Sequence, residues 1–537
     1  MRRRVMSMLA GAALAASTLL GAGPAAAATP PPEFGNDWHD PITAAPPVPK
    51  PPTKSCEVTV AEAQFKDFTP YKGDYAPPEK CGKGDWGKVV LRLDGKVKGR
   101  QYDRLGYLRI GGVEVFRTST PQPSVDGITW SVEKDVTRYS DTLARAQQVE
   151  MLIGNVVNDT YTGIIDAKVK LTFYQQRKAD AAARETPDRI IPLGDGATGT
   201  TLTTPRNSER IVAEVYATGS GGGGEEYWYL TVPDAAPYSC KADKGPYREV
   251  QVKVDGRLAG IAAPFPTVWT GGWSNPFLWY VIPGPRAFDI KPIEYDLTPF
   301  AGTLNDGRPH RVEVSVAGVP EAQTGWSTPV NVLVWQDEKS DLVTGSLTRH
   351  KEGDLANKST YTPGSGGEAH RLDTEGGHRL SVSGYVNTSH GRVSTTVTRT
   401  LANTSVHRWT DGESTDALKA TWTDRETVTT GHRAARTDRT YTMDGTTTLG
   451  AGDRLRTEIS LGDRAESVTE RGGRRTGWSV LDDRYDGDAT YTANVPRDQR
   501  HAVGISRERY RLVGDTGCYD RTLSTVQGTL TEDRRRC

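Results

Sequence analysis

The feature that most constrains this chain is the alternation of apolar and polar residues in short segments separated by turn residues. Between residues 89 and 174, the segments VVLRL, YLRI, VEVF and AKVKLTFY alternate mostly with period two, and Asp94-Gly95 and Asp126-Gly127 supply turn signals. A second set of such segments runs from 210 to 336, with Asp-Gly pairs at 255 and 306. Many short strands joined by glycine and proline turns are typical of antiparallel β-sandwiches.

The last third of the chain keeps the alternation but has a more polar face. Segments such as RVSTTVTRTL and RTDRTYTMDGTTTLG are rich in Thr, Arg and Asp, which predicts a sheet with one face in solvent. We therefore expect an all-β protein. Its predicted parts are a signal peptide (1–28), a proline-rich leader (29–55), a first sandwich (56–178), a linker (179–209), a second sandwich (210–345) and a C-terminal β-rich domain (346–537).

The N-terminus has the three parts of a secretory signal peptide. Arg2 to Arg4 supply the charged start, residues 8–20 are apolar, and Ala26 to Ala28 suit a cleavage site. No other apolar run approaches the roughly 18 residues that span a bilayer. We therefore expect a secreted protein with no membrane partner.

Five cysteines suit an oxidising compartment. The simplest pairing joins Cys56 to Cys81 and Cys518 to Cys537, each across a short stretch, and leaves Cys240 over. Spacing alone leaves the connectivity open.

Composition and motifs exclude several classes of function. Sixty-seven basic residues balance 67 acidic residues, so we expect no nucleic-acid partner. GKGDWG at 82–87 has the letters of a dinucleotide fingerprint, but it leads from a cysteine loop into a strand and lacks the required helix. The nine histidines show no metal-ligand spacing and no GxSxG elbow occurs, so we expect neither a metal nor another cofactor.

Three stretches carry candidate chemistry. Asp103 stands between Tyr102 and Arg104 at the head of a predicted strand, and Glu225 and Glu226 follow a glycine run. Aromatic residues crowd the stretches YWY at 227–229 and PFPTVWTGGWSNPFLWY at 264–280. Aromatic, glycine-rich loops on a β scaffold favour a carbohydrate ligand. The bland alternatives are an Asp paired to its neighbouring Arg, solvated glutamates, and tryptophans that fill an interface.

Hydrolysis of an amide or a glycoside without a metal needs a carboxyl group to activate water, usually with a second acid to help the leaving group. Asp103 and Glu226 could supply this pair if the two sandwiches packed side by side.

The longest of these stretches resemble a known family. GRQYDRLGYLRIGGVEVFRTSTPQP (99–123), GITWSVEKDVTRYS, MLIGNVVNDTYTGIIDAKVKLTFY and PFPTVWTGGWSNPFLW closely resemble the A-type peptide-N-glycosidases, which are peptide-N4-(N-acetyl-β-glucosaminyl)asparagine amidases. The resemblance covers residues 55 to 350. It implies two adjacent jelly-roll sandwiches, as in the F-type amidases. It also implies hydrolysis of the amide bond between the innermost GlcNAc of an N-glycan and asparagine, in a glycoprotein or glycopeptide, to give a glycosylamine and aspartate.

The resemblance also implies roles for single residues. Tyr102-Asp103-Arg104 looks like the Trp-Asp-Arg motif of the F-type enzymes, and Glu226 is similar to their second essential acid, with Glu225 as its competitor. Where those enzymes have a further supporting glutamate, this chain offers Asn155. The expected substrate-binding tryptophans are Trp228, Trp273 and Trp279.

On this hypothesis Asp103 orients or deprotonates the attacking water, Glu226 binds the GlcNAc or assists the leaving nitrogen, and Arg104 keeps Asp103 ionised. We expect a monomer. Two other functions stay open, a non-catalytic glycan-binding protein and a glycoside hydrolase that would leave GlcNAc on the asparagine.

Overall fold

Strands dominate the computed structural model, which describes residues 29–82, 86–176, 186–196, 199–220, 224–269, 275–319, 325–365 and 367–537. The predicted signal peptide and Trp273 lie outside these residues. The described helices are short turns, such as α2 (Ser140–Leu143) and α3 (Ala301–Leu304), and none is long and apolar enough to cross a membrane.

The first sandwich has two four-stranded antiparallel sheets. One sheet has the order β1 (Ser55–Phe65), β8 (Ile164–Gln175), β3 (Trp86–Lys98), β6 (Ile128–Asp135). The other has the order β2 (Tyr71–Tyr75), β7 (Gln147–Ile153), β4 (Leu105–Ile110), β5 (Val113–Ser119). This arrangement, 1-8-3-6 facing 2-7-4-5, is the eight-stranded jelly roll.

The second sandwich repeats this order. One sheet runs β15 (Ile293–Asp296), β11 (Ser208–Val215), β18 (Pro329–Gln336), β9 (Arg189–Asp195). The other runs β10 (Thr200–Leu202), β16 (His310–Ala317), β13 (Glu249–Val254), β14 (Arg257–Ala262). Numbered along the chain without the short extra pair β12 (Thr218–Gly219) and β17 (Trp326–Ser327), these strands again read 1-8-3-6 and 2-7-4-5. The predicted pair of jelly rolls is thus confirmed.

Two details of the sequence prediction were wrong. Residues 189–202, predicted as part of a linker, supply β9 and β10, the first two strands of the second roll. Pro192 and Gly194 break the alternation there, but β9 is an edge strand, where proline is tolerated. Asp94-Gly95, predicted as a turn, lies inside β3, where the Trp130 indole covers Gly95 so closely that a Cβ would meet it at 2.3 Å.

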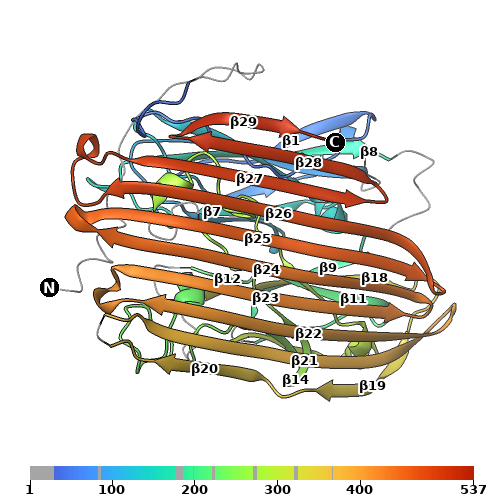
Figure 1. Cartoon of the computed structure of the whole chain (residues 1–537). Helices are drawn as coiled ribbons and strands as arrows, with labels where there is room; N and C mark the ends of the chain where they lie inside the picture. The colour runs from blue at the N-terminus through green and yellow to red at the C-terminus, as the bar shows by residue number, and fades with distance from the viewer. Residues whose placement is uncertain are drawn as a thin grey trace.

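The C-terminal region forms one 11-stranded antiparallel sheet in nearly sequential order. Its strands are β19 (Thr344–Glu352), β20 (Ala356–Thr362), β21 (His370–Thr388), β22 (Gly391–Trp409), β23 (Thr415–Thr430), β24 (Arg433–Gly450), β25 (Arg454–Arg471), β26 (Arg474–Thr492), β27 (Val503–Gly514), β28 (Gly517–Val526) and β29 (Thr529–Arg535). Figure 1 shows them as one layer in front of the sandwich strands.

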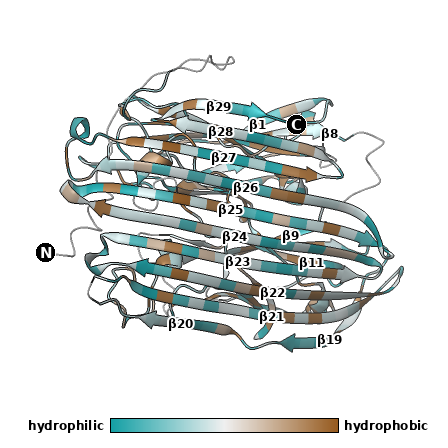
Figure 2. Ribbon diagram, in the orientation of Figure 1, coloured by the Kyte–Doolittle hydropathy of each residue, from teal (hydrophilic) through white to brown (hydrophobic). Residues whose placement is uncertain are grey.

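One face of this sheet is buried and the other is in solvent, as predicted. Along most of β23, for example, buried positions alternate with partly or fully exposed ones, and Figure 2 shows apolar and polar residues alternating along the long strands. The buried face packs on the second sandwich and its loops: Trp422 meets Trp228 at 5.5 Å between ring centroids, and Tyr485 stacks on Trp279 at 4.8 Å.

The leader and the disulfides fasten the ends of the chain. Residues 29–50 form no regular element and run along the C-terminal sheet, where Phe34 N donates to Ala502 O at 2.6 Å and Ala44 N donates to a Glu508 carboxylate oxygen at 3.1 Å. Both predicted disulfides, Cys56–Cys81 and Cys518–Cys537, are confirmed, and Cys240 is a free thiol.

Candidate active site

A buried polar network fixes the two sandwiches side by side. Arg117 of β5 forms an ion pair with Glu114 at 2.7 Å and donates across the junction to Thr218 Oγ1 at 2.6 Å and Ser327 Oγ at 3.2 Å. Asn331 of β18 exchanges hydrogen bonds with the Glu114 backbone, at 2.8 and 3.1 Å. Because a fully paired buried network tolerates little displacement, it holds the loops of the two rolls in register.

The segment between β3 and β4 carries Asp103 and is fixed by Gln101. The buried Gln101 amide donates to the carbonyl oxygens of Val156 and Gly163, both at 3.0 Å. Its oxygen accepts from Tyr102 N at 3.1 Å and from the Arg104 guanidinium, with Nε at 3.0 Å. Both neighbours of Asp103 are therefore held by one side chain.

Asn155 supports the same segment through the hydrogen bonds of its neutral side-chain amide. It is fully buried, its amide donates to Phe65 O at 2.9 Å and Gly163 O at 3.1 Å, and its oxygen accepts from Val156 N at 2.8 Å. Gly163 O thus accepts from both Asn155 and Gln101, so that Asn155 shapes the loop that anchors the Asp103 segment.

The two adjacent glutamates have different surroundings. They lie in the 3-10 segment η5 (Gly224–Leu230). Glu225 is buried, is bound by the Arg248 guanidinium at 2.8 and 2.5 Å, and accepts from Trp326 Nε1 at 2.5 Å. Since its carboxylate is occupied by a fully buried arginine and an indole, Glu225 fixes the turn, and Glu226 is the partly exposed acid of the pair.

The charges of Asp103 and Glu226 both act on Tyr227. The pKa of the Tyr227 phenol is raised well above its usual value, first by burial, then by the negative charges of Glu226 and Asp103, with a hydrogen bond to Glu226. An acid from each sandwich therefore acts on one phenol. Sequence reasoning singled out both acids but treated Tyr227 only as part of an aromatic run, and its signal was its place directly after Glu226.

A second tyrosine that the sequence analysis missed lies beside the motif. Tyr161 donates a hydrogen bond to the Tyr102 hydroxyl at 2.7 Å, and their ring centroids are 4.8 Å apart. Arg104 lies over the Tyr102 ring at 5.8 Å. Burial lowers the pKa of Arg104 and the Asp103 charge opposes this, which fits the expected closeness of Arg104 and Asp103.

Two of the predicted tryptophans, Trp228 and Trp279, do not join this group. Trp228 and Trp279 are 3% and 1% exposed, and they pack against Trp422 and Tyr485 of the C-terminal sheet. An indole without an accessible face cannot stack on a sugar, so the structure corrects the substrate contact expected of both. Their role is the alternative one, filling the interface between layers.

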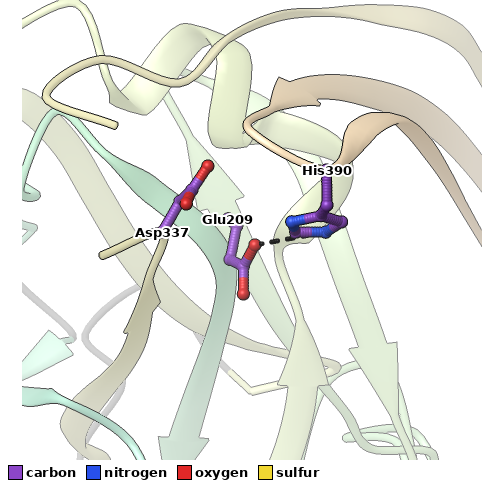
Figure 3. Close-up of side chains that lie close together, drawn as sticks. All are labelled: Glu209, Asp337 and His390. Carbon is purple, nitrogen blue, oxygen red and sulfur yellow. Dashed lines mark ion pairs between the residues drawn. The ribbon is translucent and has the colours of Figure 1, made fainter. Parts of the chain in front are cut away.

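One further cluster has the residue types of a metal site. Figure 3 shows Glu209, Asp337 and His390 close together, where β11 and the end of β18 meet the turn between β21 and β22. His390 Nε2 lies 3.6 Å from a Glu209 oxygen. Asp337, however, already accepts from the Ser389 amide at 2.6 Å and the Ser389 hydroxyl at 2.7 Å. Asp337 thus pins this turn to the second sandwich.

Two jelly rolls that each supply a carboxylate whose charge acts on one phenol form a two-sandwich protein, and a pair of acids of this kind suits hydrolysis. Residues 45–353 match the family model described as peptide N-acetyl-beta-D-glucosaminyl asparaginase amidase A. This match spans more than half of the chain, and the chain belongs to that family.

Individual proteins were also found to be similar. The chain is 30% identical over 383 residues to peptide-N4-(N-acetyl-beta-glucosaminyl)asparagine amidase A of Prunus dulcis, covering 65% of this chain and 66% of the almond protein, just under two thirds of its length. A solved structure of PNGF-II aligns with 52% of this chain and 66% of its own at 13% identity and a TM-score of 0.35, too low to support an argument about the fold.

Proposed function

We propose that this protein is a hydrolase that cleaves the amide bond between the innermost GlcNAc of an N-glycan and asparagine in glycoproteins or glycopeptides. Water adds its oxygen to the side-chain carbonyl carbon, the carbon–nitrogen bond breaks, and the nitrogen leaves with a proton as a glycosylamine, so that aspartate remains. The observation that carries the proposal is that Asp103 of one sandwich and Glu226 of the other both act by their charges on Tyr227, in a member of this amidase family.

The surroundings of the acids suggest a role for each. Asp103, adjacent to the guanidinium of Arg104, orients or deprotonates the attacking water. Glu226 binds the GlcNAc or assists the leaving nitrogen, and the Tyr227 hydroxyl orients the Glu226 carboxylate through its hydrogen bond. Gln101, Asn155 and Glu225 are positioning residues, since their polar groups are bound within the protein.

We further propose that the protein acts as a secreted monomer without cofactor, metal or nucleic-acid partner. The support is the signal-like sequence at 1–28, the two disulfides, and the equal numbers of acidic and basic residues.

The test is product mass after incubation of a defined N-glycopeptide with the wild-type protein, Asp103→Asn, Glu226→Gln and Asp126→Asn. Asp126 is an exposed loop acid outside the group, so its variant is the matched control. We expect wild type and the control to release the glycan and leave aspartate, and each of the other variants to be slower by roughly 100-fold or more. Near-normal turnover by Asp103→Asn would refute the assignment of the base. An unchanged glycopeptide with wild type would point to a glycan-binding protein, and a retained GlcNAc to a glycoside hydrolase.

A further inference from the structure

Three arginines gather where four parts of the molecule meet. Arg100 precedes the Asp103 segment, and Arg497 and Arg500 belong to the loop between β26 and β27. Trp38 of the leader and Tyr280, which follows the 3-10 turn η6 (Pro276–Leu278), complete the group. We call these five residues the arginine junction.

Ring contacts place Trp38, Tyr280 and Arg497 together, and the charges of Arg500 and Arg100 act on the same tyrosine. The Trp38 and Tyr280 rings stack at 4.2 Å, and the Arg497 guanidinium lies 5.2 Å from the Trp38 ring centroid. Burial raises the pKa of the Tyr280 phenol, and the positive charges of Arg497, Arg500 and Arg100 all oppose that rise. One hydroxyl thus lies within the field of all three cations.

The junction holds an unusual concentration of buried polar atoms without a partner among the described residues. They are Trp38 Nε1, the Tyr280 hydroxyl, Arg100 Nη2, and Nε and Nη1 of Arg497. Trp38 and Tyr280 are themselves 8% and 1% exposed. Because buried hydrogen-bonding groups are nearly always paired in native proteins, five such atoms in one place indicate a ligand that accepts hydrogen bonds.

The charge of the junction indicates the sign of that ligand. Burial lowers the pKa of both Arg497 and Arg500; the charge of Arg500 lowers that of Arg497 further, and the charge of Arg100 does the same to Arg500. Tyr280 opposes this at both arginines and Tyr491 at Arg500, but the pKa of each phenol is raised, so both phenols are uncharged at neutral pH. Asp37 also opposes it at Arg497, less strongly than Arg500 acts. Partly dehydrated like charges repel, and an anion between them removes that cost. Guanidinium groups match the planar or tetrahedral oxyanions in geometry.

The junction borders the candidate active site. The Arg100 guanidinium lies 5.4 Å from the ring centroid of Tyr161, whose hydroxyl bonds that of Tyr102, the residue before Asp103. Arg100 and Arg497 are partly exposed, so that a group carried by a substrate can reach them.

We propose that the arginine junction binds an oxyanion group, a carboxylate, sulfate or phosphate, carried by the substrate next to the scissile amide. The proposal that the substrate carries this anion rests on the proposed function. The proposal that the junction binds an anion does not rest on it. If the junction were purely structural, Arg497 would serve to hold the leader, because it donates a hydrogen bond to Gly35 O at 2.5 Å. That contact involves one nitrogen of Arg497 and leaves the donors of Arg100 and Tyr280 unexplained.

The first test measures ion binding without turnover. Thermal unfolding is followed against inorganic sulfate or phosphate at constant ionic strength, for wild type, Arg100→Gln, Arg497→Gln and Arg474→Gln, an exposed arginine at the tip of the C-terminal sheet. We expect a saturable rise of the Tm in wild type and Arg474→Gln that is lost in the other two. Should Arg497→Gln fail to fold, Arg100→Gln carries the test, since none of its described side-chain contacts involves the leader. An equal rise in all variants, or none in wild type, would overturn the site.

The second test identifies the carrier. Glycopeptides that differ only by an acidic group on the peptide, or only by one on the glycan, are compared with wild type and Arg100→Gln. Charge-assisted hydrogen bonds predict a KM at least about tenfold higher in the variant for one acidic substrate, with the neutral substrate and kcat unchanged. The pair that shows the effect identifies the source of the anion. If neither pair of glycopeptides shows the effect, the proposal that the substrate carries the anion is overturned. The first test still reports on the ion site, and the glycopeptide assay still reports on the proposed function.

Discussion

The stability of the C-terminal layer should depend on pH through a pair of buried acids. Asp483 of β26 and Glu508 of β27 are both buried, and Glu508 accepts the hydrogen bond from Ala44 of the leader. Burial raises the pKa of Glu508 to about 7, against the hydrogen bonds from Ala44 and Asp483. Burial and the Glu508 charge raise the pKa of Asp483 well above its usual value. Asp483 therefore keeps its proton, and Glu508 titrates near neutrality.

The size of the effect follows from this shift. The rise of the Glu508 pKa from 4.5 to about 7 corresponds to about 3 kcal/mol, since each pKa unit is worth about 1.4 kcal/mol. Because the pKa of Glu508 is raised in the folded state, its protonated form stabilises the folded protein. This stabilisation is fully present below the unfolded-state pKa and is lost as the pH rises through 7. In Glu508→Gln the side chain stays neutral and can still accept from Ala44 N. The variant should therefore gain stability relative to wild type, by up to about 3 kcal/mol, between pH 4.5 and 8.

The assay is urea unfolding, followed by tryptophan fluorescence at several pH values across this range, for wild type, Glu508→Gln and Glu470→Gln. Glu470 is an exposed acid of the same sheet, so its variant should track wild type at every pH. If the difference between wild type and Glu508→Gln stays constant from pH 4.5 to 8, the reasoning about the buried pair is refuted.

Three further predictions concern packing and the site. Glu225→Ala should lower the free energy of unfolding by about 3–5 kcal/mol because it leaves Arg248 buried without its ion-pair partner. Glu226→Gln should change the free energy of unfolding by less than about 1 kcal/mol. Urea unfolding of both variants checks this, and equal losses of stability would contradict it. Trp422→Ala should cost about 3–5 kcal/mol in the same assay, since its indole is buried between the layers. Burial, and after it the charge of Glu225, raises the pKa of the Cys240 thiol to about 12. Alkylation of Cys240 by iodoacetamide at pH 8 should therefore be slow in the folded protein and fast in urea. Equal alkylation rates in the two conditions would contradict this prediction.

Most of the fold could be predicted because it is encoded locally. Alternation with period two predicted about half of the strands of the two rolls and the one-sided C-terminal sheet, and the short cysteine spacings gave the pairing that the structure confirms. The strands β9 and β10 were missed because Pro192 and Gly194 hide an edge strand. The prediction of a turn at Asp94-Gly95 was wrong because only the tertiary position of Trp130 explains a glycine there.

The candidate site was predictable in part. Asp103 and Glu226 could be proposed from their motifs, but their common effect on Tyr227 depends on how β5 and β18 join the sandwiches, which no local pattern encodes. Adjacent glutamates look alike in sequence, and only the distant Arg248 distinguishes Glu225 from Glu226. Aromatic richness could not show whether Trp228 faces a ligand or another layer.

The most direct test of the central claim is hydrolysis of a defined N-glycopeptide in water enriched in heavy oxygen. If the protein is the amidase that we propose, the released peptide carries aspartate with one heavy oxygen in its new carboxyl group, and the glycan appears first as a glycosylamine without it. A peptide that keeps GlcNAc on an unlabelled asparagine, or no release at all, would contradict the account.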